Sequence, residues 1–179
     1  MQEENKVIVS DFRLKMSFLL SKKLPLLFSF LMALIVFLPI SVSFMPLVRP
    51  PLVFVCLFYF AVYAPEMLTV TEAFFLGLLT DFLSFSPLGL ETFSMTLMYL
   101  LSYYQRRFLY THSFPFLWSV FVVQAAGVLL LKWGLACLIL KAWTPVVYDL
   151  MQWLLLCAFY PFVVGVCAKI YFSVSDDLI

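Results

Sequence analysis

Charge is the scarcest property of this chain: only 12% of its 179 residues are charged, while 65% are hydrophobic. Soluble domains are roughly 45–50% apolar and about 25% charged. Charged side chains at half the usual density cannot cover a water-exposed globule of this size. The composition therefore excludes a soluble protein and predicts a polytopic membrane protein.

The residues that carry most enzyme chemistry are also few. The chain has one histidine, His112, and four scattered cysteines without a Cys-x-x-Cys pair. It has no Gly-rich phosphate loop, no Ser/His/Asp set and no cluster of metal ligands. Its net charge of +1 favours no nucleic-acid partner. We predict that the protein is not an enzyme, and that it has no catalytic, cofactor-binding or metal-binding residues.

Long apolar runs fill the rest of the chain, and they do not alternate with polar residues as the strands of a barrel would. A transmembrane helix needs about 20 mostly apolar residues. The fold predicted is an all-α integral membrane bundle of about six transmembrane helices over residues 24–172. A tail over 1–23 precedes it, and a short cytoplasmic tail over 173–179 follows. The six predicted spans cover residues 24–45, 51–64, 70–86, 92–108, 115–140 and 148–171.

Prolines and helix caps mark several boundaries. Pro50 precedes the second span and Pro65 closes it. Thr69 and Glu72 form a capping-box pattern at the start of the third span. A helix over the second span would rise only about 20 Å, against a hydrocarbon core of about 30 Å. Such a helix must thin the bilayer, extend into the interface or lie partly inside the bundle.

Basic residues predict the orientation, because cytoplasmic loops are enriched in Lys and Arg. With six spans, eight basic residues fall on one side and two on the other, which predicts that both termini lie in the cytoplasm. The eight are Lys6, Arg13, Lys15, Lys22, Lys23, Arg106, Arg107 and Lys169, and the two are Arg49 and Lys141.

The basic tail over 1–23 leaves two interpretations open. Val9, Phe12, Met16 and Leu19 recur close to helical spacing, which fits a helix lying on the inner membrane surface. The tail could equally be a loosely ordered flank that only sets topology.

Asp81 is the most informative polar residue, because a carboxylate at bilayer depth costs about 2.5–3.5 kcal/mol on insertion scales. We expect it to face the protein interior and to be satisfied there. Gly77 lies one turn earlier on the same helix face, so another helix could approach closely. Lys132 and Arg49 are the candidate cations, although Lys132 lies nearer the outer surface and could reach the headgroups instead. A partner-binding role and an ion pathway remain alternatives for Asp81.

The ordered features of the middle third resemble the MreD family, the small membrane subunit of the bacterial rod-shape system. Arg49-Pro50 opens a short apolar span that ends near Pro65. A run from Ala73 to Asp81 follows, and then Pro87-Leu88-Gly89-Leu90 precedes a further span. The positions that match the family pattern are Arg49, Pro50, Pro65, Gly77, Asp81 and Gly89.

This resemblance implies a non-enzymatic scaffold of the cell-wall elongation complex that maintains cell shape. Its implied partners are MreC, a single-span protein with a periplasmic domain, and RodA with its class B penicillin-binding protein. MreB filaments would act indirectly from the cytoplasmic side. The family fold is similar to the substrate-binding subunits of energy-coupling-factor transporters, a six-helix bundle with short or irregular helices. Gly77 and Gly127 would allow close helix approach, and a homodimer is compatible with the role.

A vitamin-binding subunit of the fold-related transporters is the alternative. Such a protein needs an outward-facing pocket in which several polar or aromatic groups converge. The predicted spans supply few polar side chains beyond Asp81, Gln124 and Lys132, which favours the scaffold. We expect no cofactor.

Overall fold

The computed structural model describes residues 26–34, 51–84, 87–141 and 145–176, and all regular structure in these ranges is helical. A helix over 26–34 lies within the first predicted span. The other helices start and end within a few residues of the second to sixth predicted segments, except that the last helix runs five residues further. They are α2 (Val53–Tyr63), α3 (Val70–Ser84), α4 (Leu90–Leu109), α5 (Phe114–Leu140) and α6 (Val147–Asp176).

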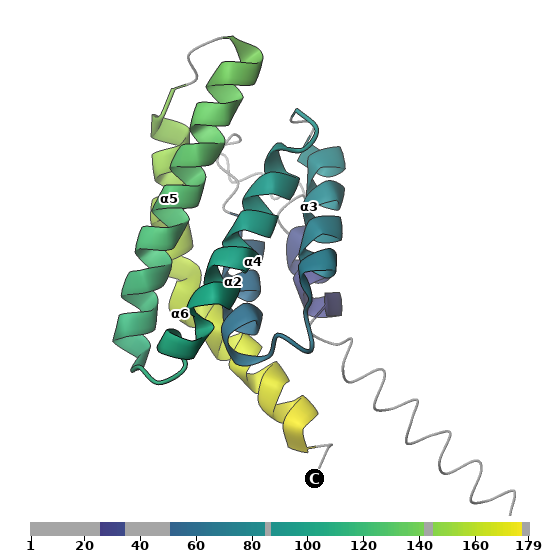
Figure 1. The fold of residues 1–179 in the computed structure, drawn as a ribbon, viewed down its shortest axis with the longest axis vertical. Coiled ribbons are helices and arrows are strands. Elements are labelled where there is room, and N and C mark those ends of the chain that lie inside the picture. The colour runs from purple at the N-terminus through teal and green to yellow at the C-terminus, as the bar shows by residue number, and fades with distance from the viewer. Residues whose placement is uncertain (1–25, 35–50, 85–86, 142–144, 177–179) are drawn as a thin grey trace, which may run out of the picture.

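Helix α2 is the centre of the core. Ten of its eleven residues are buried, and it packs against α4 and α6 (Figure 1). Eleven residues rise only about 16 Å, so α2 is too short to cross a bilayer alone. Of the three possibilities for the short second segment, the structure has the third, a helix enclosed by its neighbours. Pro65 follows the C-cap residue Ala64, where the helix ends.

Helices α3 and α4 form an antiparallel pair beside this core. Glu72 accepts a hydrogen bond from the backbone N–H of Thr69 at 2.7 Å, which is one half of the predicted capping box. Tyr99 of α4 donates to the carbonyl oxygen of Leu68 at 2.7 Å. The connection between α2 and α3 is thereby tied to α4, which also packs against α2 and α5.

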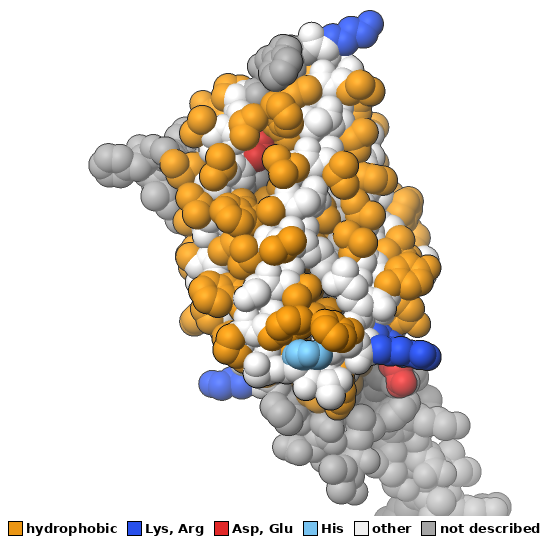
Figure 2. Space-filling model, turned by 60° about the vertical axis from the view of Figure 1, so that its left-hand side comes forward, with side chains coloured by type: hydrophobic (Ala, Val, Ile, Leu, Met, Phe, Trp, Pro, Cys, Tyr) orange, Lys and Arg blue, Asp and Glu red, His pale blue; other side chains and the backbone are white. Residues whose placement is uncertain are grey.

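Helices α5 and α6 form a second antiparallel pair, on the other side of α2 and α4 in Figure 1. By length and composition, α5 and the Val147–Tyr171 part of α6 can each cross a membrane. Only 33% and 22% of their most apolar windows are buried, unlike the core helix of a soluble protein. On the face shown in Figure 2, hydrophobic side chains cover the flank, and Lys and Arg lie toward its two ends.

Candidate functional site

The Asp81 carboxylate lies where α3 meets the start of α4, and its residue is only 1% exposed. Oδ1 accepts from the backbone N–H of Glu91 at 2.8 Å. Oδ2 accepts from the backbone N–H groups of Gly89 at 2.9 Å and Thr92 at 3.1 Å, and from the Thr92 hydroxyl. Asp81 therefore caps a helix other than its own.

The Asp81 carboxylate satisfies two requirements of the α4 N-terminus. The first N–H groups of a helix have no partner inside that helix, and Gly89 at the N-cap position of α4 has no side chain to supply one. The N-terminus also carries a partial positive charge that favours a carboxylate. Asp81 meets both needs from α3 and joins the two helices at a buried point.

Gly77 allows the two helices to come this close. A Cβ built on Gly77 would lie 2.5 Å from the Cα of Thr92 and 3.1 Å from its backbone nitrogen. Side-chain atoms do not pack so closely against backbone, so any larger residue must push α4 away from Asp81. The close helix approach expected at Gly77 is therefore made to the first turn of α4.

Gly89 completes this junction with a backbone conformation that other residues adopt at a cost. Its φ of 98° lies in the left-handed region, which glycine enters without a Cβ penalty. The same residue donates its N–H to Asp81. We call Gly77, Asp81, Gly89 and Thr92 the α3–α4 junction.

Lys132 does not pair with Asp81. Its Nζ forms an ion pair with Glu91 Oε1, and both side chains are largely buried. Glu91 is in the first turn of α4, and Lys132 is in α5. The pair joins α4 to α5, so the Lys132 ammonium is bound by a carboxylate of the bundle. Arg49, the other candidate cation, lies outside the described residues, as does the family-pattern residue Pro50.

Comparison with known proteins identifies the family. The family model described as rod shape-determining protein MreD matches residues 15–170. The chain belongs to the MreD family. No curated protein and no solved structure matches. Three of the positions on which the resemblance rested therefore build the α3–α4 junction of an MreD protein. They are Gly77, Asp81 and Gly89.

Membership defines the protein's class. MreD proteins are membrane proteins that determine cell shape, and they are not a known enzyme family. In the described ranges of this MreD chain, no group of three or more His, Cys, Asp or Glu residues could hold a metal ion. Among the described residues, the hydrogen bonds to the Asp81 carboxylate come from the start of α4, which is the geometry of a structural cap.

Two polar links in this MreD chain were not anticipated. Gln124 of α5 donates its amide hydrogens to the carbonyl oxygen of Met98 at 3.0 Å and to Ser102 Oγ at 2.8 Å, both on α4. Trp153 of α6 donates to the carbonyl oxygen of Val122 on α5 at 3.0 Å. Gln124 stood out in the sequence as a polar residue inside a span, but its partners on α4, a backbone carbonyl and a serine hydroxyl, form no sequence pattern that identifies them.

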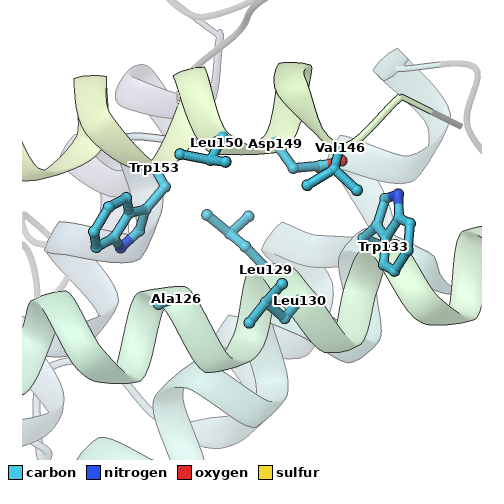
Figure 3. A pocket seen from close by; sticks show the side chains of 8 residues that line it. All are labelled: Ala126, Leu129, Leu130, Trp133, Val146, Asp149, Leu150 and Trp153. Atoms are coloured by element: carbon cyan, nitrogen blue, oxygen red, sulfur yellow. The ribbon is translucent and has the colours of Figure 1, made fainter.

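A cavity of about 250 Å³ lies between α5 and α6 of the MreD chain. Trp133 and Trp153 flank it, and among the described lining residues Asp149 alone is charged (Figure 3). The other lining side chains are aliphatic. Such a lining offers little for orienting a polar ligand.

Proposed function

We propose that this chain is a non-enzymatic scaffold of the cell-wall elongation complex. It holds an MreC-like single-span protein in the bacterial inner membrane. Through that complex it supports a RodA-type polymerase and its class B penicillin-binding protein, with MreB filaments acting indirectly. The MreD match over residues 15–170 is the observation that carries this proposal.

The use of polar side chains supports a scaffold. Asp81, Thr92, Glu91 and Lys132 contact one another or backbone atoms across helices. These contacts fix α3, α4 and α5 relative to one another, as a rigid platform requires. The exposed flanks of α5 and α6 are apolar, which suits binding to other transmembrane helices.

A vitamin-binding role finds less support. The cavity between α5 and α6 is lined by aliphatic and tryptophan side chains and one carboxylate. Recognition of a vitamin calls for several convergent polar groups. Retention of a small ligand through purification would favour the transporter alternative over the scaffold.

The topology that goes with this function has six spans and both termini in the cytoplasm. Arg106 and Arg107 occupy the last turn of α4, and Lys141 follows α5 at its C-cap. These places agree with the positive-inside rule if the C-terminal end of α4 faces the cytoplasm. Labelling single added cysteines at Arg107 and Lys141 from each side of the membrane would test this orientation.

Co-purification is the direct test of the scaffold. The tagged chain is co-expressed with its MreC-like partner and extracted in a mild detergent. We expect the partner to be retained, whereas a matched protein with an unrelated transmembrane helix and the same periplasmic domain is lost. Absence of the partner from every folded preparation of the wild-type chain would refute the proposed function.

A further inference from the structure

A groove of about 430 Å³ lies between α4 and α5, separate from the α3–α4 junction. Ser119 and Gly127 of α5 line it together with Gln105 of α4. Val123, in the same lining, is 72% exposed. The groove is therefore open toward the surroundings of the bundle, and its α5 side carries small residues that would let a helix backbone come close.

Gln124 supplies an independent sign that the groove has an occupant. Its residue lines the groove and is only 8% exposed. Its amide nitrogen donates to the Met98 carbonyl, which can only accept, so the orientation of the amide is defined. The remaining oxygen, Oε1, is buried and has no hydrogen-bond partner among the residues that the structure describes. A buried acceptor without a donor is costly, and more so in apolar surroundings.

Three kinds of molecule could occupy the groove, and they differ in whether they can donate a hydrogen bond to Gln124 Oε1. A lipid acyl chain fills apolar space but carries no donor. A second copy in a two-fold symmetric dimer presents the same surface, so with the groove on the symmetry axis one concave face would meet another and neither would be filled. A single helix from another protein is convex, and a Ser, Thr, Asn, Gln, Tyr or Trp on it can donate.

We propose that the α4–α5 groove is the seat of a partner's transmembrane helix, which donates a side-chain hydrogen bond to Gln124 Oε1. This inference rests on the proposed function, because the partner is the single-span protein that the scaffold holds. The helix lies along Ser119, Val123 and Gly127, residues four apart on one face of α5. Interhelical hydrogen bonds and close packing over small residues are the forces that join helices in lipid.

Gly127→Leu is the variant that tests the groove without harming the fold. A Cβ at Gly127 would meet nothing within 4 Å, so a leucine there fills the groove and leaves the bundle intact. Gly165→Leu on α6 is the matched control, because Gly165 is also helical and equally open. We expect Gly127→Leu to lower retention of the co-expressed MreC-like partner at least tenfold, roughly the effect of 1.4 kcal/mol. Gly165→Leu should leave retention unchanged.

A photo-reactive amino acid at Val123 identifies the occupant in intact membranes. The control carries the same group at Phe162, which is 71% exposed on α6. We expect an adduct with the transmembrane helix of the MreC-like partner from Val123 and none from Phe162. An adduct of two copies of this chain, or one with lipid alone, would overturn the inference.

The two proposals fail in different ways. If the wild-type chain retains the partner and Gly127→Leu retains it equally, the groove is not its seat, while the scaffold function stands. If the wild-type chain never retains the partner, the scaffold function fails and the groove proposal fails with it.

Discussion

The α3–α4 junction and the α5–α6 pair use this chain's side chains in opposite ways. At the junction, a buried carboxylate, a hydroxyl and two glycines meet in one place, and their hydrogen bonds stay inside the protein. Along α5 and α6, the side chains that are exposed are mostly apolar. The contrast indicates that the polar motif builds the bundle, while the flanks of the long helices face lipid or other membrane proteins.

Removing the junction carboxylate should have the largest effect. Asp81→Ala leaves three backbone N–H groups and a hydroxyl without their acceptor, and bonds to a charged group are worth about 1.5–3 kcal/mol each. We expect a loss of about 5 kcal/mol in unfolding free energy, measured by denaturation in detergent. Asp81→Asn should lose less, since one acceptor oxygen remains. Wild-type stability in Asp81→Ala would show that the junction is not structural.

The buried ion pair should come next. Lys132→Met leaves the Glu91 carboxylate buried without its cation, and breaking such a pair costs about 3–5 kcal/mol. Replacing both residues, with Glu91→Met and Lys132→Met together, should recover most of that loss, because no charge is left buried. A double variant as unstable as the single one would mean that the pair contributes beyond charge compensation.

Gly77→Ala should have an intermediate effect on unfolding free energy. The added methyl group would meet the Thr92 backbone, and overpacking costs about 1–3 kcal/mol. Gly165→Ala is the control: its Cβ meets nothing, so it should stabilise α6 by up to about 1 kcal/mol. If both variants shift the unfolding transition in the same direction, α3 and α4 are not in the contact described.

Tyr99→Phe should have the smallest effect. It deletes the hydroxyl that donates to the Leu68 carbonyl, which costs about 1 kcal/mol. Tyr104→Phe on the same helix is the control, because Tyr104 is highly exposed and should change little. Equal unfolding midpoints for the two variants would show that the tether between α4 and the α2–α3 connection is unimportant.

The sequence predicted the helices better than their contacts. Proline, capping residues and long apolar runs located most boundaries of α2 to α6, because these signals are local. Helix α4 starts at Leu90, two residues before the expected position, because its cap comes from Asp81 on α3. A capping residue that lies on another helix leaves no pattern in the local sequence, so local spacing could not predict this start.

The sequence did not predict which groups bind the charged side chains inside the bundle. Asp81 binds mainly backbone N–H groups, which every residue except proline has, so no sequence pattern identifies them. The expected depth of Lys132, nearer the outer surface than Asp81, already argued against that pair. Its actual partner, Glu91, lies 41 residues away in the sequence and on another helix, a separation that local patterns do not predict. The burial of α2 was equally hidden, since an all-apolar helix shows no preferred face.

The most direct test of the contrast between the two regions measures unfolding and retention of the MreC-like partner side by side in Asp81→Ala and Gly127→Leu. We predict that Asp81→Ala unfolds more easily, while each folded molecule still retains the partner. Gly127→Leu should unfold like the wild type and lose the partner. A stable Asp81→Ala chain that has lost the partner would contradict the account, because it would place partner binding at the α3–α4 junction.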